Sequence, residues 1–191
     1  GLRSMVAGHA RKQALNLVGA VRVKAKETPV VLMGYYNPIY VYGVDKFLLD
    51  VKAAGVDGLI VVDLPPEEDD ELCIPAMNAG VNFIRLATPT TDDRRAPAVF
   101  RNTSGFVYYV SVLGITGTKA PDLKRVAANL TRMRGHTKLH IPVRYGVKNA
   151  DHTRSIAKTD EEVVGGAASV SAVRGISTAP RTHTTKADTD V

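Results

Sequence analysis

The sequence predicts an α/β fold built from repeated strand–helix units. Continuous apolar runs, which are typical of strands covered on both faces of a parallel sheet, begin near residues 29, 58, 82, 105, 140 and 163. Amphipathic stretches lie between them, and the spacing of roughly 25–35 residues matches one βα unit. Periodicity alone leaves open whether six such units form an open doubly wound sheet or part of a closed barrel.

The apolar runs predict strands at residues 29–33, 58–62, 82–86, 105–110, 140–143 and 163–164. The periodic stretches predict helices at residues 9–24, 44–54, 67–79, 92–100, 123–133 and 151–158. The helix at 44–54 has a clear apolar face, which consists of Val44, Phe47, Leu48, Val51 and Ala54. Gly55 and Gly80 follow two of these helices and are expected to end them.

The two ends of the chain differ from the regular middle. Before residue 29 there is one helix with no strand ahead of it, so the first unit is expected to lack its strand. After residue 175 the composition changes to Thr, Ala, Asp and Lys without apolar periodicity. We therefore expect one partial (β/α) domain at residues 1–176 and a disordered tail at residues 177–191.

Composition excludes several classes of protein. The net charge of +6 is dispersed, and the basic residues of the first helix (Arg11, Lys12, Arg22, Lys24) are expected to form a solvated face, not a nucleic-acid site. The single cysteine, Cys73, excludes an internal disulfide and is expected to be a small core residue. No apolar run reaches the roughly 18 residues of a membrane span, and the start does not resemble a signal peptide, so a cytoplasmic protein is expected.

A tyrosine-rich segment, LMGYYNPIYVYG at residues 32–43, covers the end of the first predicted strand and the loop expected after it. Ligands bind at the carboxyl ends of parallel strands, in barrels and in open sheets alike. Tyrosine offers a flat apolar wall with a polar tip, which suits an aromatic substrate. Tyr35 is therefore a candidate to face a ligand, and packing within a barrel is the alternative.

Asp63 ends the second strand and is followed by an acidic run, Glu67 to Glu71. The end of an apolar strand is a common location for a catalytic or orienting carboxylate. The acidic run is better explained by the start of a helix than by a metal, because acids in the first turn complement the helix dipole. The five histidines are scattered without metal-ligand spacing, so no metal site is expected.

Glycines follow the later strands, in SVLGITG at residues 111–117, Tyr-Gly at 145–146 and Gly-Gly at 165–166. Glycine lets backbone N–H groups approach a phosphate closely, and Thr116 adds a hydroxyl. Glycines after the last strands of a barrel typically bind phosphate. The chain contains no Walker A loop, dinucleotide fingerprint, GxSxG elbow or HExxH motif.

Four segments together resemble one known family. The segments VVLMGYYNPIY (30–40), AGVDGLIVVDLPPEE (54–68), FIRLATPTT (83–91) and GFVYYVSVLGITG (105–117) are similar, in this order, to the tryptophan synthase alpha subunit. The resemblance is dense from about residue 28 to residue 117 and thins afterwards. It implies a TIM (β/α)8 barrel, incomplete here, in which this chain supplies strands three to eight.

The resemblance also implies a reaction, a lyase step of tryptophan biosynthesis. Indole-3-glycerol phosphate is cleaved to indole and glyceraldehyde 3-phosphate, and one group must protonate the indole ring while another removes a hydroxyl proton. In the family a Glu on the second strand and an Asp in the loop after it do this, and both would lie upstream of Gly1. The step needs no cofactor, because pyridoxal phosphate belongs to the beta subunit of the α2β2 complex.

The resemblance assigns the following roles to residues of this chain. Residues expected to bind the indole and phosphate parts of the substrate are Tyr35, Tyr108, Thr116, Gly117, Gly146, Gly165 and Gly166. Asp63 is expected to orient or couple groups near the subunit contact, not to act as the base. Residues expected to meet the beta subunit are Asn37, Pro38, Pro65 and Glu67.

Two residues depart from the family pattern. Arg144 replaces a glycine beside the phosphate site, and Gly166 replaces a serine whose hydroxyl would be a donor. Two alternatives to an active lyase follow: an inactive barrel fragment that at most binds the beta subunit, or another phosphate-binding TIM-barrel enzyme. The ordered motifs at residues 34–38 and 62–68 argue against the second.

Overall fold

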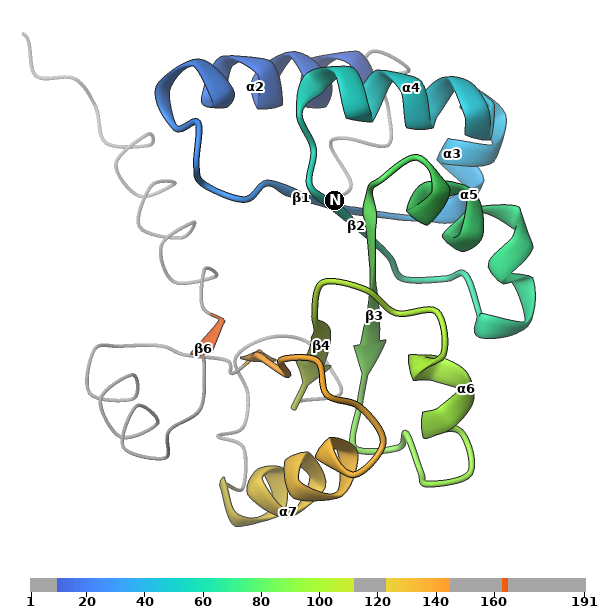
Figure 1. Ribbon diagram of the computed structural model, residues 1–191, viewed down its shortest axis with the longest axis vertical. Helices are drawn as coiled ribbons and strands as arrows, with labels where there is room; N and C mark the ends of the chain where they lie inside the picture. Colours follow the sequence, from blue (N-terminus) through green and yellow to red (C-terminus); the bar gives the residue numbers. More distant parts are fainter. Residues whose placement is uncertain (1–9, 112–122, 145–162, 165–191) are drawn as a thin grey trace, which may run out of the picture.

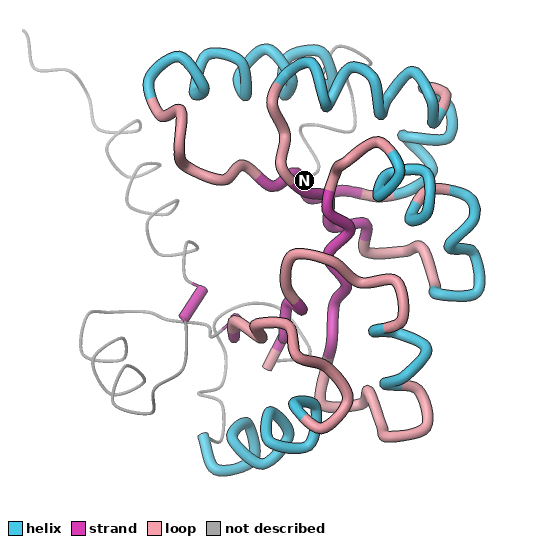
Figure 2. Tube along the Cα trace, viewed as in Figure 1, coloured by secondary structure: helices cyan, strands magenta, loops and turns pink. Residues whose placement is uncertain are grey.

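The computed structural model describes residues 10–111, 123–144 and 163–164, and these form one curved, wholly parallel sheet with helices along one side (Figures 1 and 2). The strands pair in chain order: β1 (Val31–Gly34), β2 (Gly58–Val61), β3 (Asn82–Ala87), β4 (Val107–Val110), β5 (Val143–Arg144) and β6 (Val163–Val164). A doubly wound sheet would reverse its strand order partway. The unbroken order therefore favours part of a barrel over the open sheet.

The helices follow one another along the outer side of the sheet, from α2 to α7 (Figure 1). They are α2 (Ala10–Lys24), α3 (Tyr36–Tyr42), α4 (Val44–Ala54), α5 (Cys73–Asn78), α6 (Ala96–Phe100) and α7 (Leu123–Arg134), with a 3₁₀ segment η1 (Pro66–Glu71). In the part of the chain that the structure describes, none of the helices could span a lipid bilayer.

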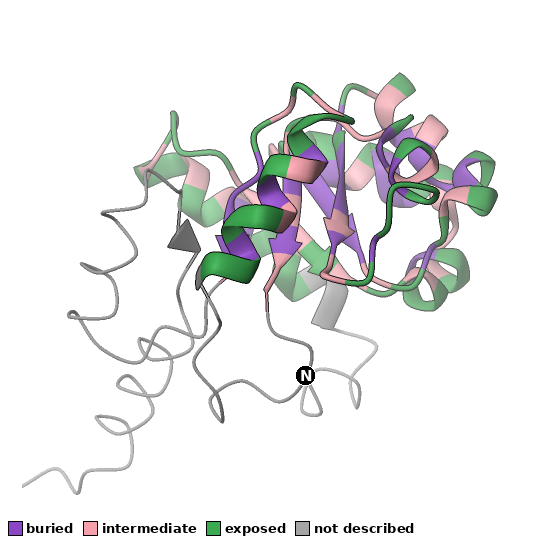
Figure 3. Ribbon diagram, turned by 90° about the horizontal axis from the view of Figure 1, so that it is seen from below, coloured by how far each residue is buried: buried purple, intermediate pink, exposed green. Residues whose placement is uncertain are grey.

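The hydrophobic core lies between the sheet and these helices (Figure 3). One cluster joins α4 and α5 to β2 and β3, and a second joins α6 and α7 to β4 and β5. The predicted face of α4 is confirmed, because Leu48 and Val51 are buried while Leu49 is 72% exposed. Cys73 is a free, buried thiol in the first cluster, as expected.

Two predicted helices are shorter than the pattern indicated, and proline explains both. Residues 67–79 divide into η1 and α5, because Pro75 has no N–H to donate to the Glu71 carbonyl in a continuous helix. Helix α6 begins at Ala96, not at residue 92, because Pro97 likewise cannot bond back to residue 93. The Asp92 carboxylate instead accepts the Arg95 N–H at 2.8 Å in a turn.

The segment after β1 was predicted as a loop and is the helix α3. The strand boundaries also shift: β1 starts at Val31 instead of 29, β4 at Val107 instead of 105, and β5 at Val143 instead of 140. Gly105 has a φ of 77°, which an extended strand does not allow.

Glycine ends the helices where the sequence predicted it. Gly55 lies in the left-handed region with a φ of 84°, and its N–H bonds back to α4. The basic residues of α2 were predicted to form a solvated face, and for Arg22 this prediction is wrong. The Arg22 side chain donates a hydrogen bond to the Gly55 carbonyl and forms an ion pair with Asp57. Arg22 therefore joins α2 to the turn before β2.

Several predictions fall outside the described residues. These are the glycine-rich loop with Thr116 and Gly117, Gly146, Gly165 and Gly166, the helix at 151–158 and the tail at 177–191.

Candidate functional site

Alternation along the strands divides their side chains between a helix-covered face and an inner face. Tyr109 and Val143, which are partners in the β4–β5 ladder, pack against α7 in the second core cluster. Successive side chains point to opposite faces of a sheet. Tyr108 and Arg144 therefore lie on the inner face, the face on which barrel enzymes bind their ligands at the carboxyl ends of the strands.

Tyr108 is half-buried on this inner face and packs edge-to-face on Phe106, with ring centroids 6.4 Å apart. Burial raises the pKa of the Tyr108 phenol, and the positive charge of Arg144 acts in the opposite direction. The phenol therefore keeps its proton at neutral pH. Its ring provides an apolar wall, and its hydroxyl provides a donor.

Tyr35 lies at the same carboxyl edge, between the end of β1 and the start of α3, and is 59% exposed. The next residue is held firmly by two carboxylates. The Tyr36 N–H donates to Asp63 Oδ1 at 2.7 Å, and the Tyr36 hydroxyl donates to Glu71 Oε2 at 2.7 Å. Asp63 thus serves as an acceptor for the first turn of α3 and fixes the backbone beside Tyr35.

The two tyrosines expected to line the indole site thus share one edge of the sheet, separated by β2 and β3. A strand spacing of about 4.8 Å gives a separation of roughly 14 Å across three strand intervals. No ring contact joins Tyr35 and Tyr108 among the described residues. Their role in ligand binding stays a prediction.

Arg144 ends β5, the position where the resemblance expects a glycine. Its carbonyl accepts a hydrogen bond from the Ser111 hydroxyl at 2.7 Å, which links the ends of β4 and β5. Its guanidinium is near enough to affect the titration of Tyr108. The edge where a phosphate is expected therefore carries a positive charge in addition to any backbone donors.

The residues predicted to meet a partner lie on two exposed segments, which together form the predicted partner surface. Asn37 and Pro38 on α3, and Pro65 and Glu67 around the start of η1, are all exposed. The two contacts of Tyr36 with Asp63 and Glu71 join α3 to the β2–η1 segment. The two segments are thus held in a fixed relation.

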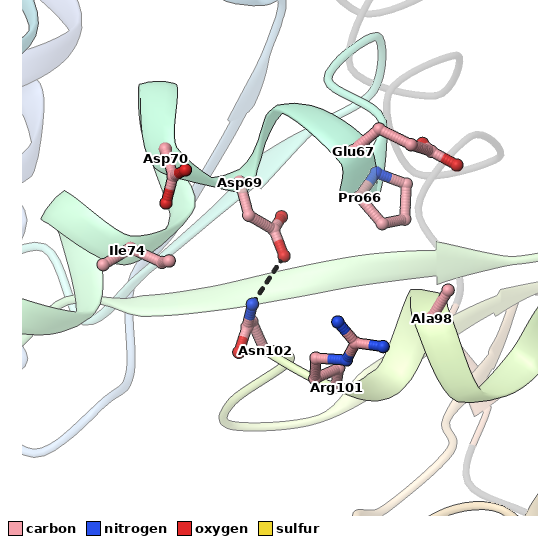
Figure 4. Close-up of a pocket in the computed structure, with 8 residues that line it drawn as sticks. All are labelled: Pro66, Glu67, Asp69, Asp70, Ile74, Ala98, Arg101 and Asn102. Carbon is pink, nitrogen blue, oxygen red and sulfur yellow. Dashed lines mark hydrogen bonds between the residues drawn. The ribbon is translucent and has the colours of Figure 1, made fainter.

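Two clefts adjoin this surface. One, of about 220 Å³, lies at the carboxyl ends of β2 and β3, and its wall includes Thr88, Thr90 and Arg95. The other, of about 320 Å³, lies between η1, α5 and α6, and its wall includes Glu67, Asp70 and Arg101 (Figure 4). Within the described parts of the chain no three metal-binding side chains converge.

Sequence reasoning missed a buried ion pair beside the second cleft. Arg85, 5% exposed, pairs with Asp69, whose side chain is 10% exposed. Asp69 therefore belongs to an internal contact, not to a solvated helix start. The available signal was an arginine in the middle of an apolar strand, since arginine is rarely buried without a partner.

Comparisons with known proteins agree with the resemblance. The family described as tryptophan synthase alpha chain matches residues 1–190. Among solved structures, the tryptophan synthase alpha subunit of Legionella pneumophila is 32% identical with a TM-score of 0.76, over 87% of this chain and 61% of that chain. The A-subunit of Pyrococcus furiosus is 36% identical with a TM-score of 0.74, over 88% of this chain and 66% of that chain.

A chain from the Pyrococcus furiosus tryptophan synthase a2b2 complex is 38% identical with a TM-score of 0.75. The match covers 86% of this chain and 66% of that chain. This chain therefore spans 61% to 66% of the length of these solved relatives. The predicted fold, an incomplete TIM barrel, is confirmed by these relatives and by the order of the strands.

Proposed function

The chain belongs to the tryptophan synthase alpha chain family, and on that basis we propose that its inner face binds indole-3-glycerol phosphate for cleavage to indole and glyceraldehyde 3-phosphate. The observation that carries this proposal is the arrangement of Tyr108 and Arg144 on one face at the carboxyl edge. An uncharged aromatic ring beside a cation suits a ligand with an aromatic part and a phosphate.

The described residues would serve binding, not proton transfer. Tyr108, with its phenol protonated at neutral pH, can pack against an indole ring and donate one hydrogen bond. Cleavage also requires a group that protonates the ring carbon and one that takes a hydroxyl proton. The resemblance matches neither carboxyl group to this chain, so we propose that these 191 residues alone bind substrate without turnover.

We propose the tryptophan synthase beta subunit as the partner, bound by Asn37, Pro38, Pro65 and Glu67. Its support is the exposure of these residues on two segments that Tyr36 joins. The alpha step would need no cofactor, because pyridoxal phosphate would belong to the beta subunit. A second candidate function, an inactive chain that only binds the beta subunit, is favoured by the same observation.

A binding assay with neighbouring tyrosines tests the substrate proposal. Titration calorimetry would compare the wild-type chain with Tyr108→Ala and Tyr109→Phe. Loss of an apolar wall is expected to weaken binding of indole-3-glycerol phosphate by at least about tenfold in Tyr108→Ala. Tyr109 faces α7, so Tyr109→Phe should bind normally. Equal affinities in all three proteins would contradict the proposal.

Turnover and co-purification separate the alternatives. Release of indole from the substrate by the chain with the beta subunit would show an active lyase. Binding of the beta subunit without substrate binding would favour the non-enzymatic candidate. Turnover of another phosphorylated sugar, but not of indole-3-glycerol phosphate, would indicate another phosphate-binding TIM-barrel enzyme.

A further inference from the structure

A buried arginine connects the middle of the sheet to the segment that carries the predicted partner residues. Arg85 lies in the centre of β3 between Phe83 and Ala87, which both pack in the helix-covered core. Its guanidinium donates one hydrogen bond to the Leu64 carbonyl and another to the Asp69 carboxylate. One side chain therefore fixes two points of the segment 64–69.

The other oxygen of Asp69 is also occupied. Asn102, which follows α6, donates from Nδ2 to Asp69 Oδ2 at 2.7 Å, and Figure 4 shows these two side chains pointing toward each other. The Asn102 carbonyl in turn accepts a hydrogen bond from Cys73 Sγ at 3.4 Å. The network thus joins β3, the β2–η1 segment, α5 and the end of α6.

A contribution to stability does not by itself explain why the chain has this buried network. Burial of two charges is costly, and packed apolar side chains in place of a buried ion pair often give equal or greater stability. Arg85 Nε has no hydrogen-bond acceptor among the described residues, and the Phe83 ring lies 4.8 Å from the guanidinium carbon. What an apolar pair could not replace is the bond to the Leu64 carbonyl.

The Leu64 carbonyl lies next to residues that contact α3 and residues predicted to meet the partner. Leu64 lies between Asp63, which holds the start of α3, and Pro65, the first predicted partner residue of this segment. Glu67 lies between Leu64 and Asp69, the two residues to which Arg85 donates hydrogen bonds. We propose that Arg85 is a positioning residue, which sets the backbone of residues 63–69 in the conformation that a partner subunit binds. This inference rests on the partner surface of the proposed function.

Three variants of the ion pair and one control separate positioning from stability. Arg85→Met leaves the Asp69 carboxylate buried without its cation and is expected to destabilise the chain. The double variant Arg85→Met/Asp69→Leu replaces the pair by apolar side chains and should recover cooperative unfolding. Arg85→Lys retains the charge with fewer donors and should restore loop order in part. The control is Arg132→Met on α7, which removes an ion pair with Asp93 and a hydrogen bond to the Thr91 carbonyl but no contact of residues 63–69.

Hydrogen exchange of the isolated chain is the primary measurement. In the double variant, peptides covering residues 63–72 should exchange at least about tenfold faster than in wild type, while peptides of β3 remain protected. Unchanged exchange in a stable double variant would overturn the proposal. This result does not depend on any partner.

Affinity for the tryptophan synthase beta subunit is the second measurement. The double variant should bind at least about tenfold more weakly, and Arg132→Met should bind like wild type. Full affinity in the double variant would also overturn the proposal. Failure of the wild-type chain to bind would refute the proposed partner, and the exchange data would still decide whether Arg85 positions the segment.

Discussion

Adjacent leucines on α4 provide a sharp test of the core. Leu48 is 5% exposed and packs in the first core cluster, whereas Leu49 is 72% exposed. The substitutions Leu48→Ala and Leu49→Ala remove the same three carbon atoms from neighbouring positions of one helix. Helix propensity changes equally in both variants, so any difference between them reports burial.

The expected magnitudes differ widely. Three buried carbons at about 0.8 kcal/mol each account for about 2.4 kcal/mol for Leu48→Ala, and the cavity left behind adds to this. A total loss of about 3–4 kcal/mol is therefore expected. Leu49→Ala should change the free energy of unfolding by no more than about 0.5 kcal/mol.

Urea unfolding followed by circular dichroism measures both values by linear extrapolation. A thermal melt should show Tm lower by roughly 6–16 °C for Leu48→Ala, at about 2–4 °C per kcal/mol for a chain of this size. Equal losses in the two variants, or a larger loss for Leu49→Ala, would show that α4 does not pack on the sheet through its predicted face.

Three further outcomes follow from individual ionisable groups. Desolvation and a carboxylate partner raise the pKa of Tyr36 to about 12. Its stabilising contribution is therefore complete below about pH 10 and is lost between pH 10 and 12. In Tyr36→Phe the free energy of unfolding should depend less on pH in that range. Hydrogen bonds from His136 and Arg132 lower the pKa of Asp93. The contribution of Asp93 to stability is therefore complete above about pH 4 and is lost as the pH falls through the lowered pKa. In Asp93→Asn, urea titrations at pH 2–4 should show a free energy of unfolding that depends less on pH. Burial raises the pKa of the Cys73 thiol to about 11, so Ellman's reagent at pH 8 should react only after unfolding, and rapid labelling of the native chain would contradict its burial.

The elements of the fold were predictable where local chemistry is decisive. Gly55 ends α4 in the left-handed conformation that the sequence predicted, because few other residues adopt it at low cost. The breaks before Pro75 and Pro97 were also within reach of sequence reasoning, since each proline lacks the N–H that a continuous helix needs. Each proline lies in the first turn of its helix, so the helix begins just before it although the apolar periodicity starts earlier.

The order of the strands was not predictable from periodicity, because both candidate architectures have the same spacing and the same crossover hand. The family resemblance favours the barrel, and the pairing of β1 through β6 in sequence order agrees with it. The Arg85 network is hidden for a similar reason. Its acceptors, the Leu64 carbonyl and Asp69, come from a segment whose path past β3 is set by tertiary packing.

The two neighbouring tyrosines of β4 lie on opposite faces of the sheet, and the alternation of side chains along the strand predicts which is which. Val107 and Tyr109 belong to one face by alternation, and both are completely buried against the helices, so Tyr108 must face the other way. The helix-covered face of this strand bears on stability and the inner face bears on ligand binding. Residue type alone does not distinguish Tyr108 from Tyr109, because both are tyrosines. Their positions do, because residues an even number apart along a strand share one face.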